Sequence, residues 1–338
     1  MTSTVTPHSP NTSVLEGVPG PLIPGTRHDA LIGDGAQAVM TRYWQYGKGM
    51  NDGTFPEGSY PVLLVHGFRG DHHGLEIIAN YLLKLIPNVS IISPDLPGFG
   101  RSADLPENAQ GGDNINAYVA WLNNFVEHTN PVREDAQPLP LHVVGHSFGS
   151  IVTSAFAAAH PNSLALLSLI NPISEPALEG SQRVASRLAS LYYRAGAALP
   201  EKIGYPLLRS QLITRASSEV MMRTKDKAMR RFINGQHAAY FGSFGSRRGV
   251  LSAYEASIMH TAAEYAAAIR VPVQMLVAED DDLGTPETAR AMYATLTSRD
   301  LPDSRNLPVS STGARERLDM IPEVGHLIHY ETPRRAAE

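Results

Sequence analysis

The sequence has no cysteine, and it also lacks a long apolar run and a strongly basic balance. The absence of cysteine excludes thiol catalysis, disulfide bonds and Cys-ligated metal sites, although it leaves the cellular compartment open. No stretch reaches the roughly 18 apolar residues of a membrane span, and the N-terminus has neither the basic start nor the apolar run of a signal peptide. We therefore expect a cytoplasmic protein. The net charge of -5 predicts no nucleic-acid partner.

The composition is that of an ordinary globular protein. A chain of 338 residues with 43% hydrophobic and 18% charged residues can bury a large core, either as one domain with an insertion or as two domains. Residues 1–26 are rich in Pro, Ser, Thr and Gly, which predicts a flexible tail outside the fold.

Short apolar runs alternate with helical segments along the rest of the chain. Such runs are typical of strands that are buried on both faces of a parallel sheet. They occur at residues 61–67, 89–95, 141–147, 164–170 and 271–279, and a plausible strand precedes them from about residue 37. Helical patterns follow at about Leu75–Leu85, Asn114–Glu127 and 148–160. This order predicts an α/β fold with a mostly parallel sheet flanked by helices.

A long insertion separates the last two of these runs. It has about 95 residues, far more than one crossover helix needs. Its stretches are amphipathic and typical of helices, so we expect a helical cap at residues 175–266, over the carboxyl edge of the sheet. The core would then comprise residues 27–174 and 267–338.

The sharpest local signal is the run Gly145-His146-Ser147-Phe148-Gly149, which follows an apolar strand and opens a helical segment. In a G-x-S-x-G turn of this kind, the serine is forced outward and the small glycines avoid clashes with neighbouring chain. The helix that begins there also favours developing negative charge. Ser147 is therefore our candidate nucleophile, and the alternative is an ordinary exposed serine on a strand-to-helix turn.

A serine hydroxyl becomes a strong nucleophile only when a base takes its proton, and a carboxylate usually orients that base. In a fold of this type the acid and the base follow the nucleophile along the chain. The histidines after Ser147 are His160, His237, His260, His326 and His329. We favour His326, because it follows a possible last strand at residues 315–321 and so falls where sites gather in open α/β sheets. His329 is the rival.

Four adjacent carboxylates, Glu279 to Asp282, follow the strand that ends near Ala278. Thr285 and Pro286 then provide an N-cap and a first helical position, for a helix that we expect to extend to about Leu296. Charge alone does not distinguish the four carboxylates. At least three of them are expected only to solvate the loop.

Acyl transfer also requires two fixed N–H donors for the oxyanion of the tetrahedral intermediate. One should be the backbone N–H of Phe148, directly after the nucleophile. The other should come from the loop after residues 61–67, where Phe68 is the natural donor. We expect His66 to brace that loop rather than to take part in catalysis.

These motifs together resemble the capped α/β-hydrolase superfamily of serine hydrolases and esterases, over most of residues 37–174 and 267–333. The resemblance rests on HGF (66–68), DLPGFGRS (95–102), GHSFG (145–149), AEDDDL (278–283) and GHLIHYETP (325–333). It implies that the acid stands three residues beyond Ala278, at Asp281. It also implies that the base stands at His326, in a stretch G-H-L-x-x-x-E-x-P.

The stretch from Arg69 to His73 departs from the family pattern because it is unusually charged, and its role stays open. Adjacent histidines on a turn rarely point together, so we expect no metal at His72 and His73. The resemblance implies no cofactor.

The function expected from these residues is hydrolysis of a carboxylic ester, including lipid-like acyl esters, through an acyl-serine on Ser147. Acyl transfer and cleavage of amides, thioesters or carbon–carbon bonds use the same apparatus, and the sequence does not separate them. A serine in this position argues against dehalogenase and epoxide hydrolase chemistry, which use an aspartate. A binding protein without turnover is the alternative from another class. The natural substrate, its chain length and the oligomeric state stay open.

Charge is unevenly distributed along the chain. Residues 175–262 hold 13 Lys and Arg against 6 Asp and Glu, whereas the rest of the chain holds 15 against 27. One interpretation is that the basic side chains form solvated helix faces that pair with the acidic body. The other is that they attract an anionic substrate or an anionic lipid surface to the pocket mouth.

Overall fold

The computed structural model describes residues 22–47, 52–106, 114–130, 139, 141–178, 183–299 and 316–338. Its strands are β1 Thr26–Ile32, β2 Val39–Gly47, β3 Tyr60–Val65, β4 Val89–Pro94, β5 His142–His146, β6 Leu166–Ile170, β7 Val273–Ala278 and β8 Arg317–Ile321. Within the described residues they form an eight-stranded sheet in the order β1-β2-β4-β3-β5-β6-β7-β8. From β4 to β8 neighbouring strands are parallel, while β1 and β2 are antiparallel. The mostly parallel sheet is therefore confirmed.

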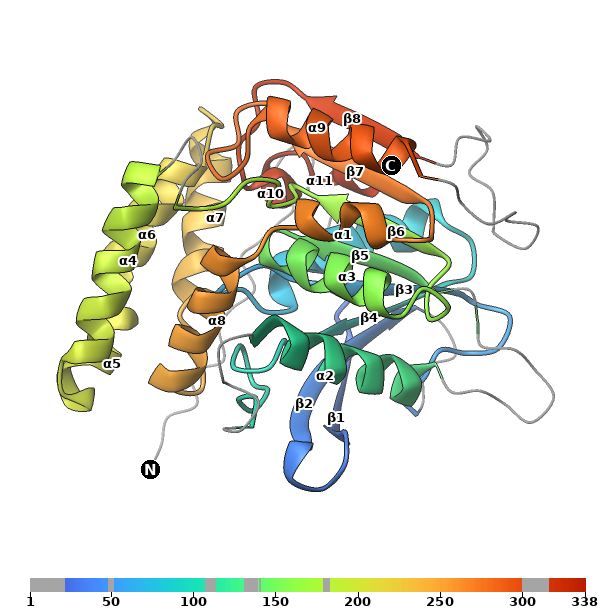
Figure 1. The fold of residues 1–338 in the computed structure, drawn as a ribbon, viewed down its shortest axis with the longest axis horizontal. Helices are drawn as coiled ribbons and strands as arrows, with labels where there is room; N and C mark the ends of the chain where they lie inside the picture. The colour runs from blue at the N-terminus through green and yellow to red at the C-terminus, as the bar shows by residue number, and fades with distance from the viewer. Residues whose placement is uncertain are drawn as a thin grey trace.

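Helices cover both faces of this sheet (Figure 1). They are α1 His73–Leu85, α2 Asn114–Thr129, α3 Phe148–Ala159, α9 Pro286–Thr297, α10 Ile328–Glu331 and α11 Pro333–Ala337. In strand β3, successive side chains point alternately to the two faces of the sheet. Its Leu63 and Val65 pack into the apolar cluster that contains α2, α3 and α9, whereas Val62 and Leu64 pack into the cluster that contains α1. All four side chains are fully buried, as expected for an apolar run in a central parallel strand.

Most of the described residues between β6 and β7 are helical. The helices are α4 Arg183–Ala198, α5 Glu201–Leu208, α6 Gln211–Met221, α7 Lys227–Tyr240 and α8 Arg247–Met259, and a 3-10 helix follows at Ala263–Ala268. We call residues 183–259 the insertion. Its helices stand together at one side of the sheet (Figure 1). That this insertion acts as a cap, with the domain boundaries expected above, stays a prediction.

Arg69 joins the insertion to the sheet. It lies in the loop after β3, in the charged stretch whose role the sequence left open, and its side chain is buried. The guanidinium donates to the carbonyl oxygens of Leu208 (2.7 Å) and Phe241 (3.2 Å), and it lies over the ring of Phe244. A buried guanidinium needs such acceptors to replace water, so Arg69 fixes the insertion in place.

Two sequence predictions concern the ends of the fold. Most of the predicted tail, residues 1–21, lies outside the described residues, while its last residue, Thr26, begins β1. In the part of the chain that the structure describes, no helix has both the length and the apolar character needed to cross a membrane.

Candidate active site

Ser147 lies at a sharp turn between β5 and α3. Its backbone has φ 53° and ψ -121°, a conformation that is strained for a residue with a side chain. The flanking glycines are required by space. A Cβ atom at Gly145 would lie 2.2 Å from Thr153 Oγ1, and one at Gly149 would lie 2.3 Å from the carbonyl oxygen of Val65. The local sequence thus folds as the predicted elbow, with the serine at the carboxyl end of the central strand.

The structure brings Ser147, His326 and Asp281 together. Nε2 of His326 lies 2.8 Å from Oγ of Ser147, and its Nδ1 lies 2.9 and 3.0 Å from the two carboxylate oxygens of Asp281. The side chains of His326 and Asp281 are 5% and 3% exposed. Because an ionised carboxylate only accepts hydrogen bonds, Asp281 holds the proton on Nδ1 and leaves Nε2 free to accept from the serine.

The other carboxylates of this loop have different positions. Glu279 and Asp280 are exposed, as expected for residues that solvate the loop. Asp282 differs from the expectation, because it forms an ion pair with Arg223 of the insertion. Only the register that places Asp281 three residues beyond Ala278 turns a carboxylate toward the imidazole.

Asn171, which the sequence analysis missed, fixes the two loops that carry His326 and Asp281. Its Oδ1 accepts the N–H of Ala278 (2.8 Å), and its Nδ2 donates to the carbonyl oxygen of His326 (3.0 Å). It follows β6 directly and has a φ of 44°. A polar residue at the end of an apolar strand indicates a possible site residue. The sequence does not identify its partners, because they lie more than a hundred residues away along the chain.

Glu331 makes a similar link on the other side of His326. Its carboxylate accepts the backbone N–H groups of Arg223 (2.7 Å) and Thr224 (2.9 Å), and also that of Gly325 (3.3 Å). The insertion and the loop that bears His326 are therefore tied to one carboxylate.

The assignment of Phe148 and Phe68 as oxyanion donors stays a prediction, and two features of the structure are compatible with it. Phe148 is the first residue of α3, so its N–H has no acceptor within the helix. The loop before Phe68 passes directly against the nucleophile, because a Cβ atom at Gly67 would lie 3.1 Å from Cβ of Ser147. His66 braces this loop, accepting the N–H of Leu96 and donating to the carbonyl oxygen of Gly67, each at 2.8 Å.

Other histidines near Ser147 are neutral at neutral pH. Burial lowers the pKa of His146 to about 3 and that of His237 to about 4, and it also lowers the pKa of His329. His329, the rival base, has its ring 4.2 Å from the ring of His146 and makes no hydrogen bond with Ser147 in the described structure. Geometry therefore favours His326.

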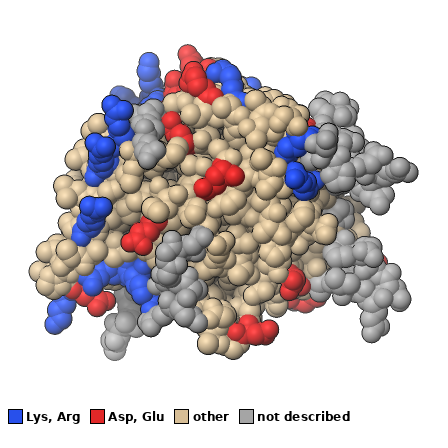
Figure 2. Space-filling view, in the orientation of Figure 1, with Lys and Arg blue, Asp and Glu red and all other residues tan. Residues whose placement is uncertain are grey.

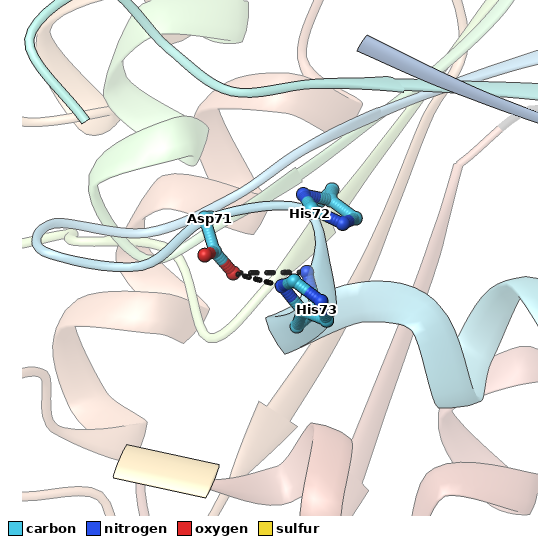
Figure 3. Close-up of side chains that lie close together, drawn as sticks. All are labelled: Asp71, His72 and His73. Atoms are coloured by element: carbon cyan, nitrogen blue, oxygen red, sulfur yellow. Dashed lines mark hydrogen bonds and ion pairs between the residues drawn. The ribbon is translucent and has the colours of Figure 1, made fainter. Parts of the chain in front are cut away.

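Asp71, His72 and His73 place one possible ligand atom each within 4.8 Å of one another. Figure 3 shows Asp71 paired with His73, whose backbone N–H and Nδ1–H both donate to Asp71 Oδ1 at 3.0 Å. The His72 ring donates instead to Asp95, at 2.8 Å. Burial opposes protonation of His73, but the hydrogen bond and the charge of Asp71 outweigh it and raise the pKa. Hydrogen bonds thus account for the cluster, and we assign it no metal.

A cavity of about 140 Å³ opens beside Ser147, between the sheet and the insertion. Residues from both parts line it, including Gly67, Phe68, Met221, His237, Tyr240, Leu283, His326, Leu327, His329 and Tyr330. The candidate nucleophile therefore lies on the wall of a small cavity, which is the usual setting of a small-molecule site.

The pattern of the alpha/beta hydrolase family matches residues 62–338 of this chain. The chain belongs to that family. Among curated proteins, it is similar to the lipase LipV of Mycobacterium tuberculosis, with 37% identity over 38% of this chain and 42% of that protein. It is also similar to the monoglyceride lipase of Rattus norvegicus, with 23% identity over 58% of each chain. The matches thus span about half the length of these relatives.

Solved structures agree on the fold. A carboxylesterase structure from Nitrososphaera gargenis superposes with a TM-score of 0.62 at 18% identity, covering 91% of this chain and 94% of that one. An esterase from Exiguobacterium antarcticum gives 0.61 at 15% identity, covering 89% and 93%. At such identities the likeness shows the fold alone. The family match, together with the lipase relatives, supports a hydrolase.

Proposed function

We propose that this protein hydrolyses carboxylic esters through an acyl-serine formed on Ser147. The observation that carries the proposal is the continuous chain of hydrogen bonds from Ser147 through His326 to Asp281 at a strained elbow. In the first half-reaction, His326 takes the hydroxyl proton while Oγ attacks the ester carbonyl carbon. The N–H groups of Phe148 and Phe68 would stabilise the oxyanion.

The first tetrahedral intermediate then collapses: the bond to the alcohol oxygen breaks, His326 gives that oxygen its proton, and the acyl group stays on Ser147. In the second half-reaction His326 takes a proton from water as the water oxygen attacks the acyl carbon. Collapse of the second tetrahedral intermediate releases the acid and returns the proton to Ser147. Ser147, His326 and Asp281 suffice for the proton transfers, and no cofactor takes part in these steps.

Two further observations support an ester of modest size. The relatives include proteins described as lipases and as a monoglyceride lipase. The cavity beside Ser147, at about 140 Å³, is close in volume to a cavity of roughly 150 Å³ that holds benzene in another protein. We therefore propose that it holds a small acyl or alcohol group.

A fluorophosphonate probe tests the nucleophile, because it labels only an activated serine. We expect stoichiometric labelling of Ser147, located by peptide mass spectrometry, and no labelling of Ser147→Ala. A protein that binds ligands without turnover would stay unlabelled. A panel of matched butyrate esters, amides and thioesters then separates the alternatives that share this apparatus, and we expect the esters to be turned over fastest. Release of acid rather than transfer to an added alcohol would separate hydrolysis from acyl transfer.

We propose, second, that the basic insertion attracts an anionic lipid or substrate surface. The observation that favours this is helix α4, where Val184, Leu188 and Leu191 are 67%, 65% and 65% exposed. Their spacing places them on one face of the helix, and arginines lie among them in the sequence. Figure 2 shows Lys and Arg side chains along the side of the molecule that the insertion occupies. The cytoplasmic location expected from the sequence stays a prediction.

A further inference from the structure

A tight turn after β3 carries the N–H group of Phe68 past the nucleophile. The turn runs from Gly67 to Gly70, and the N–H of Gly70 donates to the carbonyl oxygen of Gly67 at 3.1 Å. A Cβ atom at Gly67 would lie 3.1 Å from Cβ of Ser147, so the turn and the nucleophile are in close contact. Because the N–H of Phe68 belongs to the peptide group that joins it to Gly67, a small rotation of the turn moves this N–H relative to Ser147.

Arg69 has a backbone conformation in this turn that its residue type disfavours. It is the third of the four residues, and its φ is 61°. A positive φ at the third position of such a turn favours Gly or Asn, because a Cβ atom is crowded there. Strained residues of this kind persist only where surrounding contacts fix them. Contacts outside the turn must therefore hold Arg69.

The side chain of Arg69 makes those contacts, and its hydrogen bonds in the described structure all go to the insertion. The guanidinium donates to the carbonyl oxygens of Leu208 (2.7 Å) and Phe241 (3.2 Å) and to the Tyr193 hydroxyl (3.4 Å). It also lies 5.1 Å and 5.4 Å from the ring centroids of Phe241 and Phe244. A buried cation that left these acceptors would have no replacement for water, so the guanidinium is fixed relative to the insertion.

The side chain of Phe68 extends in the same direction. Its ring lies 5.8 Å from the ring of Tyr193 and 6.0 Å from the ring of Tyr254, both in the insertion. Phe68 and Arg69 thus end among residues of the insertion, while their backbone passes beside Ser147. A displacement of the insertion would therefore be transmitted to the turn.

We propose that Arg69 is a positioning residue that ties the N–H of Phe68 to the insertion, so that this oxyanion donor is in place only while the insertion is docked against the sheet. The inference rests on the proposed ester hydrolysis and adds how that site is controlled. Arg69 does not line the cavity beside Ser147. Its loss should therefore act on the transition state, in which the oxyanion forms, and leave substrate binding nearly unchanged.

Arg69→Met tests the tie, because methionine keeps an apolar stem and removes the guanidinium. We expect kcat on p-nitrophenyl butyrate to fall by about tenfold to a hundredfold, since a donor displaced by about 1 Å loses much of its effect, while KM changes less than about threefold. Here kcat is counted per site that reacts with the fluorophosphonate. The affinity for butylboronic acid should fall in parallel, because its adduct with Ser147 places an oxygen where the oxyanion forms. A role confined to folding would reduce the number of reactive sites and leave this affinity unchanged.

Two more variants separate the anchor from the charge and from the turn. Arg69→Lys keeps the cation but has one nitrogen, which cannot reach the same set of oxygens. We expect it to lie between the wild-type protein and Arg69→Met in both kcat and boronate affinity. Arg69→Gly suits the left-handed φ better than arginine does, but it has no anchor. We expect it to lose as much as Arg69→Met.

Arg247→Met is the matched control, because Arg247 is also an arginine that donates to carbonyl oxygens. It lies on α8 and donates to the carbonyl oxygen of Leu199 at 2.6 Å, within the insertion. In the described structure it makes no hydrogen bond with residues 67–70. Its kcat and its boronate affinity should stay within about threefold of the wild-type values, even where the free energy of unfolding falls.

Three results overturn the inference. One is a kcat and a boronate affinity within about threefold of the wild-type values in Arg69→Met or, where that variant does not fold, in Arg69→Lys. Another is a full kcat in Arg69→Gly, which would show that the turn places the N–H of Phe68 without an anchor. The third is an equal loss in Arg247→Met. Failure of the proposed function differs from all three, since the wild-type protein itself would then neither turn over the ester nor react with the fluorophosphonate.

Discussion

At the scale of single residues, the site depends on backbone geometry as much as on the reactive groups. The left-handed φ of Ser147 turns Oγ away from α3 and toward His326, while Gly145 and Gly149 allow the chain to pass where no side chain fits. The strain is local and is held by β5 and α3. The nucleophile can therefore be changed without changing the turn.

We expect Ser147→Ala to abolish ester turnover and leave the fold intact, because alanine keeps the backbone conformation and removes only the attacking oxygen. Initial rates on p-nitrophenyl butyrate and a thermal unfolding scan measure the two effects. Residual activity above a tenth of the wild-type rate would contradict the assignment of Ser147.

The acid can be tested within one loop. Asp281→Asn should lower kcat by about three orders of magnitude or more, because an amide can stabilise the wrong tautomer of His326. Asp280→Asn and Asp282→Asn serve as matched controls, since Asp280 is exposed and Asp282 pairs with Arg223. Each of these two variants should lower kcat by less than about tenfold. If Asp280→Asn or Asp282→Asn had the large effect instead, the assignment of Asp281 would be wrong.

Asn171 is a positioning residue, and its effect should appear in kcat rather than in KM. Asn171→Ala leaves the N–H of Ala278 and the carbonyl oxygen of His326 without their partner, which costs about 1–3 kcal/mol for each buried group. We expect slower fluorophosphonate labelling of Ser147 together with a lower free energy of unfolding in urea. A loss of stability with an unchanged labelling rate would show that Asn171 supports the fold but not the site.

At the scale of elements, the sequence predicts the strands and helix ends that depend on a local pattern of residues. Buried runs predicted the strands from β3 to β7, and the segments proposed as strands near residue 37 and at residues 315–321 form β2 and β8. The cap of α9 was confirmed at Thr285, whose side chain accepts the N–H of Thr288. Strand β1 was missed because it is an edge strand with polar residues and mostly exposed side chains. The roles of Asn171 and the packing of the His329 ring against His146 could not be predicted, because both depend on segments distant in the chain.

Helix α4 provides a test of recruitment at this scale. The wild-type protein should sediment with vesicles of phosphatidylglycerol and phosphatidylcholine in roughly 20 mM salt and be released in roughly 300 mM, as the Debye length shortens from about 20 to 6 Å. Leu188→Glu should weaken binding severalfold by charging the apolar face. Leu31→Glu is the control, because Leu31 is 59% exposed on β1.

Two outcomes would contradict recruitment by α4. One is equal sedimentation with purely phosphatidylcholine vesicles, and the other is unchanged binding by Leu188→Glu. The basic residues would then act only as ion-pair partners of the acidic body, as Arg223 does with Asp282 and Arg248 does with Asp104 at 3.8 Å.

At the scale of the whole molecule, buried neutral histidines make stability depend on pH. Burial lowers the pKa of His142 and His237 to about 4 and that of His146 to about 3, whereas in the unfolded chain histidine ionises near 6.5. Below about pH 6.5 these histidines are therefore protonated in the unfolded chain but stay neutral in the folded protein. Each group should lower the free energy of unfolding by about 1.4 kcal/mol per pH unit as the pH falls toward 4.

His73 acts in the opposite direction, because its raised pKa makes the folded protein take up a proton before the unfolded chain does. Its contribution is complete below about pH 6.5, so it does not offset the loss at lower pH. Urea titrations at pH 7, 6 and 5 should show a steadily falling free energy of unfolding. His142→Gln, which lies outside the cavity beside Ser147, should reduce the slope by about one proton. A free energy of unfolding that stays constant from pH 7 to 5 would show that these imidazoles are hydrated in the folded protein, because only then could they bind protons as readily as in the unfolded chain.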